Sequence, residues 1–251
     1  MAAVESIYRY PVKGLSPERL DGARLEPGHT LPADRKYAIE NGPSGFDPAT
    51  PKYFPKTQFL MLMRNERLAT LDTRYEDASH TLTIRHDGCE LARGDLSSRE
   101  GRLAIEAFFR RFMPAELRGP PKVLTAPGHS FSDVASKVVS VINLATVAAI
   151  ETAIGVPVHP LRFRANLYVA GWPAWHEFSL VGQEIAIGAA RLKVTKRIMR
   201  CTATNVDPDT GLRDLAIPAT LMQTFDHADC GVYAQVIAGG EIKPGDAIAT
   251  P

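Results

Sequence analysis

The hydrophobic positions of the chain fall into short runs, and glycines and prolines separate these runs. The chain has 19 glycines and 19 prolines, and such punctuation is typical of many short strands joined by turns. The pattern predicts strands at residues 4–10, 24–25, 35–40, 61–63, 69–72, 81–85, 89–93, 138–141, 166–170, 184–187, 191–195, 231–237 and 247–249. Residues 75–80 lie between two short predicted strands and read as a hairpin connection.

Helical periodicity is limited to a few segments. In residues 100–113 it places four apolar side chains roughly on one face, namely Leu103, Ala107, Phe108 and Phe112. Residues 143–154 begin at a good N-cap, Asn143, and stop at Gly155. The pattern also allows a short helix around residues 218–224. We therefore predict a mainly β (α+β) fold with a few helices, organised as barrels.

The stretch 114–127, which contains Pro120 and Pro121, is the predicted seam between two parts of the chain. A β-rich first part precedes it, and the second part opens with Phe131-Ser132-Asp133. No repeat or low-complexity tract interrupts either part, and 251 residues suffice for one large or two small domains.

Composition and charge narrow the function classes. The net charge is +1, so nothing global recruits nucleic acid or an anionic membrane. There is no apolar stretch of about 18 residues, so no membrane span is expected, and the N-terminus shows no signal peptide. Three scattered cysteines do not make a disulfide framework, and an odd count suits a reducing compartment. We expect a cytoplasmic protein.

Cys201 is the most informative single residue. A basic, strand-like run at residues 191–198 leads to it, and the turn-forming Asp207-Pro208-Asp209-Thr210-Gly211 follows. Cations beside a thiol favour the thiolate, which binds soft metals and electrophiles. The alternatives are a buried small hydrophobic residue and, for the charged run, a solvated strand face. A cysteine hydrolase would need a partner histidine, which the sequence cannot place beside Cys201.

Two other segments carry side chains suited to anions. Arg162-Phe163-Arg164-Ala165-Asn166 precedes an apolar strand, and guanidinium groups recognise phosphate or carboxylate in a bidentate way. Lys13-Gly14 follows the first strand, with Asp34-Arg35 downstream. The alternatives are a structural salt bridge for the arginines and a surface turn for Lys13-Gly14. The latter is not a phosphate-binding P-loop, because its spacing is wrong.

A third cluster, at residues 226–233, contains His227, Asp229 and Cys230. Such side chains bind zinc, but the spacing lacks a second Cys or His pair. Zinc is therefore a weak hypothesis for this segment.

The motifs and their order along the chain resemble those of the MOSC family with its N-terminal β-barrel domain. This family includes the amidoxime-reducing components and their bacterial relatives. The resemblance covers nearly the whole chain. It rests on residues 10–13, 34–35, 143–146, 162–166, 231–233 and 243–246 and, most specifically, on 200–211. It implies an N-terminal β-barrel-like domain at residues 1–95 and a MOSC β-barrel domain at residues 96–251.

The resemblance also implies a molybdenum cofactor of the molybdopterin type, with Cys201 as the metal ligand. Pyridoxal phosphate is not expected. A soft thiolate suits the metal and an arginine suits the cofactor's phosphate. By motif, the cofactor-binding residues would be Lys13, Gly14, Arg35, Thr146, Arg164, Asn166, Arg200 and Tyr233. Asp207 would lie near the open face of the metal and take a catalytic role beside Cys201.

Some positions depart from the family pattern. Gly14 stands where relatives often have serine, Ala165 where they often have proline, and Met199 where a small polar residue is common. Neither a membrane-anchoring N-terminus nor a C-terminal iron–sulfur module is visible. Electrons are therefore expected from separate donor proteins, of the ferredoxin, flavoprotein or cytochrome b5-like kind.

Three functions remain open on these grounds. The first is a molybdenum-dependent oxidoreductase that reduces small N-hydroxylated, amidoxime-type compounds. The second is a carrier of the cofactor or of sulfur, without turnover of its own. The third is a two-domain β protein with a structural cysteine, which would leave the ordered motifs unexplained.

Overall fold

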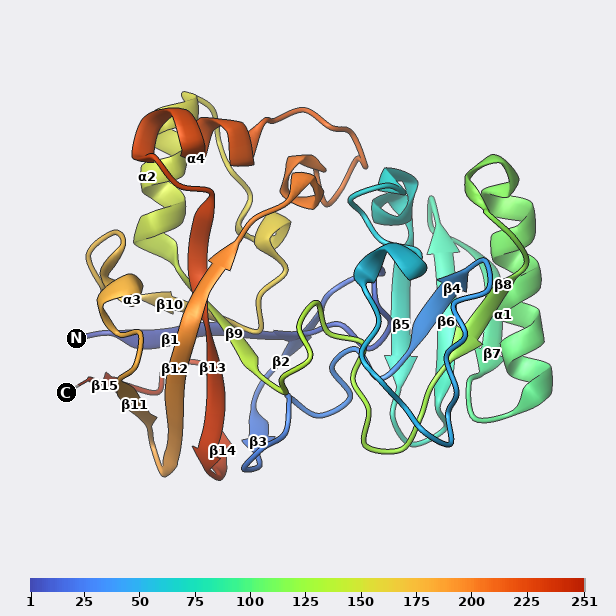
Figure 1. Ribbon diagram of the computed structural model, residues 1–251, viewed down its shortest axis with the longest axis horizontal. Coiled ribbons are helices and arrows are strands. Elements are labelled where there is room, and N and C mark those ends of the chain that lie inside the picture. Colours follow the sequence, from blue (N-terminus) through green and yellow to red (C-terminus); the bar gives the residue numbers. More distant parts are fainter. Residues whose placement is uncertain (251) are drawn as a thin grey trace.

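The computed structural model describes residues 1–250, which fold into a larger and a smaller unit side by side (Figure 1). Strands β1 and β15, near the two ends of the described chain, both lie in the larger unit. Its main sheet has eight strands in the order β15-β11-β12-β13-β9-β10-β1-β2. These strands are β1 (Ala3–Arg9), β2 (Glu18–Leu20), β9 (Val139–Asn143), β10 (Leu167–Ala170), β11 (Glu184–Ile187), β12 (Ala190–Met199), β13 (Asp229–Ala238) and β15 (Ile248–Ala249).

Alternation of apolar and polar residues sets the inner face of this sheet. Along β12, Leu192 and Val194 are buried whereas Lys193 is exposed, as expected for a strand with one face on a core. The pair β9–β10 is parallel, and β12 and β13 pair antiparallel with three register shifts. A two-stranded ribbon of β3 (Ala23–Leu25) and β14 (Gly240–Ile242) contributes to the same core.

Three helices belong to the larger unit, namely α2 (Leu144–Ile154), α3 (His176–Ser179) and α4 (Ile217–Phe225). The Asn143 side chain caps α2 by accepting from the Ala145 N–H, and Gly155 ends it in a left-handed conformation. Apolar side chains of α2 and α4 form a second core cluster with β9 and β10.

The smaller unit contains a three-stranded sheet, a two-stranded sheet and one long helix. These are β5 (Asp72–Glu76), β6 (Thr81–His86) and β7 (Cys89–Asp95), then β4 (Ala38–Asn41) with β8 (Pro121–Leu124), and α1 (Arg99–Phe112). Helix α1 covers the outer edge (Figure 1) and buries Ile105, Phe108 and Phe109 in the core of this unit. Short 3₁₀ helices are η1 (Lys56–Gln58), η2 (Glu66–Thr70), η3 (Pro114–Glu116), η4 (Pro160–Phe163) and η5 (Thr202–Asn205).

The mainly β fold with few helices confirms the predicted class. Two of the predicted strands are wrong. Residues 61–63 lead into a turn, because the N–H groups of Arg64 and Asn65 both donate to the Met61 carbonyl. Residues 69–70 belong to η2, and the strand starts only at Asp72.

The two units are not consecutive in sequence. Residues of β1 and β3 share a core with β9–β13, whereas α1 and β8 pack in the smaller unit. The chain therefore starts in the larger unit, crosses to the smaller one and returns. A division into residues 1–95 and 96–251 stays a prediction, and a division by packing alone would place α1 and β8 with the smaller unit.

Candidate functional site

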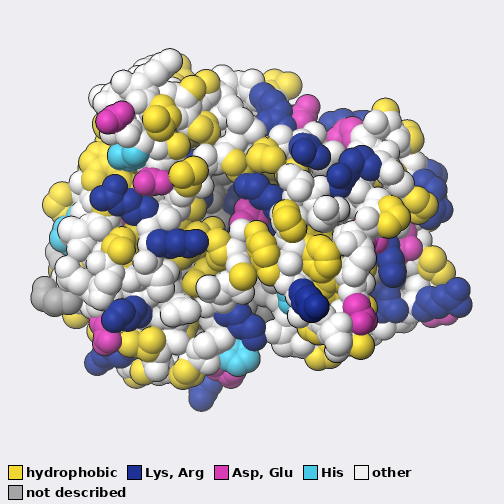
Figure 2. Space-filling model, viewed as in Figure 1, with side chains coloured by type: hydrophobic (Ala, Val, Ile, Leu, Met, Phe, Trp, Pro, Cys, Tyr) yellow, Lys and Arg dark blue, Asp and Glu magenta, His cyan; other side chains and the backbone are white. Residues whose placement is uncertain are grey.

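A cavity of about 490 Å³, here called the central pocket, lies between the two units. Figure 2 shows the surface hollowed there, with basic and acidic side chains inside. Eight cationic side chains but only two carboxylates line it: Lys13, Arg35, Lys56, Arg162, Arg164, Lys196, Arg197 and Arg200, with Asp133 and Asp229. A surplus of positive charge in a recessed site favours an anionic ligand.

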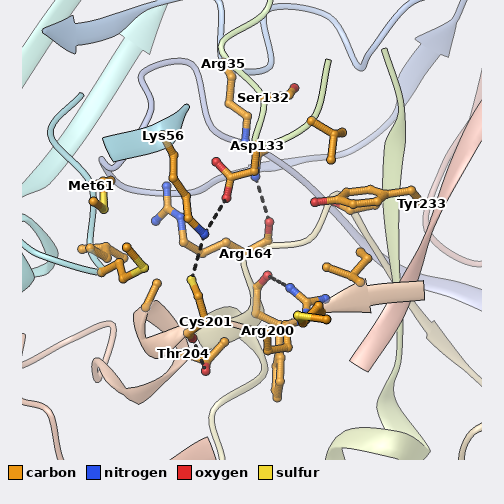
Figure 3. A pocket seen from close by; sticks show the side chains of 18 of the residues that line it. Arg35, Lys56, Met61, Ser132, Asp133, Arg164, Arg200, Cys201, Thr204 and Tyr233 are labelled. Carbon is orange, nitrogen blue, oxygen red and sulfur yellow. Dashed lines mark hydrogen bonds and ion pairs between the residues drawn. The ribbon is translucent and has the colours of Figure 1, made fainter. Parts of the chain in front are cut away.

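Cys201 lies in this pocket between the end of β12 and the start of η5. Its backbone is fixed because the Thr204 hydroxyl and N–H both donate to its carbonyl, at 2.9 and 3.1 Å. The thiol is only partly buried. Its Sγ accepts a hydrogen bond of 3.1 Å from the Lys56 ammonium (Figure 3). The sulfur is thus held in place and open to a ligand.

Lys56 reaches this sulfur from η1 in the smaller unit and was not among the predicted site residues. Burial acts to lower its pKa, but Asp133 and Cys201 outweigh burial and raise it. No local pattern around Pro55-Lys56 signals this role, because only the packing of the two units brings Lys56 and Cys201 together.

Arg35 and Arg164 meet over one aromatic ring. Their guanidinium carbons lie 4.8 and 4.3 Å from the centroid of Tyr10, within cation–π range. Arg35 also donates to the Arg164 carbonyl at 3.0 Å, and Arg164 to the Leu15 carbonyl at 2.7 Å. Both residues have left-handed backbones, with φ of 51° and 50°, a strained conformation found preferentially at functional sites.

Replacing the shared ring tests whether it holds both arginines. We expect Tyr10→Leu to lower the free energy of unfolding by about 2–4 kcal/mol, because it removes a fully buried ring and two cation–π contacts. Tyr10→Phe keeps the ring and loses only the 3.3 Å bond to the Ala165 carbonyl, which is about 1 kcal/mol. Urea unfolding of the two variants measures both values, and equal losses would refute the role of the ring.

Lys13 and Asp133 form an ion pair in the pocket between a buried ammonium and a more accessible carboxylate. The Lys13 ammonium contacts the Asp133 carboxylate and donates to the Phe131 carbonyl at 2.8 Å. Burial lowers the pKa of Lys13, and Asp133 opposes that shift. For Asp133, burial works against ionisation, but Lys13 and Lys56 hold the pKa of its carboxyl well below its usual range.

The remaining predicted residues of the pocket play different parts. Figure 3 shows the Tyr233 hydroxyl pointing into the cavity. Arg200 lies in the wall, but its guanidinium donates to the carbonyls of Phe163 and Cys230. Asn166 is buried and accepts from Ser140, so its amide joins strands. Gly14 lines the pocket where its backbone approaches the Leu60 carbonyl.

The structure does not bring Thr146 or Asp207 into the central pocket. The Thr146 hydroxyl is fully buried, donates to Glu177 and accepts from the Trp175 N–H. The Asp207 carboxylate accepts from Thr210 and Arg162 and closes the turn that follows the cysteine motif. In this structure both side chains make contacts within the protein, whereas the predicted cofactor contact of Thr146 and the predicted catalytic role of Asp207 stay predictions.

Arg162, unlike Arg164, forms the structural ion pairs that were the alternative for this arginine motif. It donates two bonds of 2.7 Å to Asp214 and one of 2.8 Å to Asp207. In the cluster at residues 226–233, Cys230 is buried in the core, and burial raises the pKa of its thiol to about 12. Within residues 1–250, no three His, Cys, Asp or Glu side chains gather closely enough to hold a metal ion.

Comparison with family models accounts for nearly the whole chain. The model of the MOSC N-terminal beta barrel domain matches residues 1–114, and the model of the MOSC domain matches residues 126–249. The chain belongs to the MOSC family. The MOSC domain contributes Cys201, Arg164 and Tyr233 to the central pocket, and the N-terminal domain contributes Lys13, Arg35 and Lys56.

Mitochondrial amidoxime reducing components are similar to this MOSC protein over part of its length. Mitochondrial amidoxime reducing component 2 of Bos taurus is 29% identical over 122 residues, which are 44% of this chain and 36% of that protein. Mitochondrial amidoxime-reducing component 1 of Homo sapiens is 27% identical over 120 residues, 43% and 35% of the two chains. The match thus spans about a third of the length of these relatives.

Among solved structures, the YUAD protein of Bacillus subtilis aligns over 99% of this chain and 94% of its own, with a TM-score of 0.45 and 13% identity. YiiM of Geobacillus stearothermophilus aligns over 45% and 53%, with a TM-score of 0.36 and 21% identity. Within the part of this chain that the structure describes, no helix is long and apolar enough to cross a membrane.

Proposed function

We propose that this MOSC protein is an oxidoreductase that binds a molybdenum cofactor through Cys201 and reduces N-hydroxylated compounds of the amidoxime type. The observation that carries the proposal is the accessible Cys201 sulfur in a pocket lined by cations from both domains. The similarity to amidoxime reducing components supports the reaction class.

The donor set fits such a cofactor. A thiolate is a soft ligand that suits molybdenum, and Arg35 and Arg164 carry planar guanidinium groups that suit a phosphate. Both arginines are already oriented by Tyr10 and by backbone carbonyls, so little side-chain entropy is lost on binding. A bound molybdenum centre would supply the two-electron redox chemistry.

Different residues of the pocket would bind different parts of the cofactor. Cys201 would ligate the metal, and Lys56 would keep the sulfur in place through its N–H···S bond. Lys13, Arg35 and Arg164 would hold the anionic end of the cofactor. Tyr233 presents a hydroxyl to the space in front of Asp133 and Cys201.

Turnover of a simple amidoxime by an artificial reductant tests the proposed reaction. Two electrons and two protons convert the amidoxime to the amidine and water, so we expect two electrons from the reductant for each amidine formed. Protein from a host that makes the cofactor should turn over, and Cys201→Ser should not. Cys89→Ser is the matched control, because Cys89 is exposed and lies outside the pocket.

Molybdenum bound to the wild type without turnover would contradict the reductase and indicate a carrier of the cofactor. A sulfur adduct on Cys201 in place of the metal would indicate sulfur transfer. Under either result the central pocket would remain the functional site, but its function would be carriage or sulfur transfer and not reduction.

The electron source and the compartment are further parts of this proposal. The names of the relatives describe them as components. We propose that a separate protein of the ferredoxin, flavoprotein or cytochrome b5-like kind donates the electrons. The three free thiols suit a reducing compartment, and we place the protein in the cytoplasm on that ground.

A further inference from the structure

A carboxylate of the chain itself lies among the cations of the central pocket. Asp133 contacts the Lys13 ammonium, and its second oxygen is 3.7 Å from the Lys56 ammonium. The cations around it are built into the protein, with 5% of the Lys13 side chain and 16% of the Arg35 side chain exposed. The Asp133 side chain is 45% exposed. The cations are therefore fixed, and the carboxylate is the accessible member of the cluster.

Asp133 belongs to a segment with few other attachments. The connection between β8 and β9, residues 125–138, has no helix or strand. It is anchored at Phe131, whose ring is buried in an aromatic cluster and whose N–H donates to the Arg35 carbonyl at 2.8 Å. Beyond that anchor, residues 132–137 form no backbone–backbone hydrogen bond with the described chain. Segments of this kind open at low free-energy cost.

The attachments of this segment converge on Asp133 itself. Its carbonyl accepts from the Tyr53 hydroxyl at 3.1 Å, and its carboxylate accepts from Lys13. An incoming anion that replaced the carboxylate at Lys13 would remove the main tie of the segment while the Phe131 anchor stayed in place.

The buried Lys13 ammonium requires an anion beside it, both with and without a ligand in the pocket. Lys13 is a nearly fully buried ammonium, and a buried charge that loses its partner is strongly destabilising. Asp133 supplies the compensating charge in the protein without ligand. A phosphate group would supply it equally well and would bring additional acceptor oxygens for Lys56 and Arg35.

We propose that Asp133 is a displaceable internal anion, whose carboxylate occupies the subsite of Lys13, Lys56 and Arg35 until a phosphate group enters and residues 132–137 move away. The identity of the natural ligand, a phosphate-bearing cofactor, rests on the proposed function, whereas the subsite requires only a phosphate. Free phosphate must compete with Asp133, so the pocket favours ligands with a second point of attachment, such as Cys201.

Isothermal titration of the whole 251-residue chain without cofactor, with inorganic phosphate at about 0.15 M ionic strength, tests this competition. We expect Asp133→Asn to bind phosphate about tenfold more tightly than the wild type, because the competing charge is gone. Asp229→Asn is the matched control, since Asp229 lines the same pocket but forms no ion pair within residues 1–250. It should change the affinity less than about twofold, because Asp229 does not pair with Lys13 or Lys56 and its remaining effect on phosphate is screened by salt.

Unchanged or weaker binding by Asp133→Asn would overturn the proposal and make Asp133 a fixed part of the site. Equal gains in the two variants would overturn it as well, because they would reflect net charge alone. Tighter binding by Asp133→Asn only would support it.

A second measurement uses the wild type and so does not depend on the folding of a variant. Trypsin cleavage after Lys137, in the Asp133 segment, should become several-fold faster when phosphate saturates the pocket. An unchanged or slower rate would overturn displacement. A small chromogenic substrate in the same buffer corrects for any effect of phosphate on trypsin.

The two proposals can fail separately. Phosphate binding needs no molybdenum, so tighter binding by Asp133→Asn beside a wild type that takes up no molybdenum would refute the proposed function and support displacement. If the wild type takes up molybdenum but Asp133→Asn binds phosphate no more tightly than the wild type, the proposed function would be supported and displacement refuted.

Discussion

Gly231→Ala is expected to lower the free energy of unfolding by about 3–5 kcal/mol, a sum of backbone strain and overpacking. Gly231 lies in β13 with φ of 76°. A Cβ there would meet the Val141 carbonyl of β9 at 2.4 Å and the Ile142 side chain at 2.5 Å. The Val141 carbonyl cannot withdraw, because it is backbone of an interior strand of the main sheet.

The substitution should also disturb the candidate site. The same Cβ would lie 3.2 Å from the Arg200 guanidinium, which is held by the Cys230 carbonyl. Since Arg200 precedes Cys201, a shift of this side chain would move the wall of the central pocket. Lower phosphate affinity of the folded fraction would report that shift.

Gly245→Ala is the control that separates strain from crowding. Gly245 also has a positive φ, 92°, but a Cβ there meets nothing within 4 Å. It should cost about 1–2 kcal/mol, for the left-handed backbone alone. The midpoints of urea unfolding give both free-energy losses when the slopes of the unfolding curves are equal. Equal losses in the two variants would contradict the close approach of β13 and β9.

Local signals predicted most of the secondary structure. Asn143 and Gly155 mark the ends of α2 because a cap and a left-handed glycine act within one turn. The strand Glu184–Ile187 was predicted with its observed bounds. Strand β8 was missed because Pro120 and Pro121 suggested a seam, yet a proline is tolerated as the first residue of a strand. The short strands β2 and β14 carry too few apolar residues to show a period.

The arrangement of the site depends on contacts that no local pattern encodes. The motifs nominated Cys201, Lys13 and Arg164, and the packing of the two units brings them to one pocket. Lys56 and Asp133 were missed as site residues because their partners are 145 and 120 residues away in sequence. Thr146 and Asp207 stand in matching motifs, but neighbouring groups take up their hydrogen bonds.

The central claim is that Cys201 ligates molybdenum, and the metal content of purified protein tests it most directly. Wild type, Cys201→Ser and Cys89→Ser are produced in a host that makes the cofactor and are analysed for molybdenum per chain. Serine keeps the shape of the side chain but removes the soft ligand. The account predicts stoichiometric molybdenum in the wild type and in Cys89→Ser, and none in Cys201→Ser. A wild type without molybdenum, or a Cys201→Ser variant that retains it, would contradict the account.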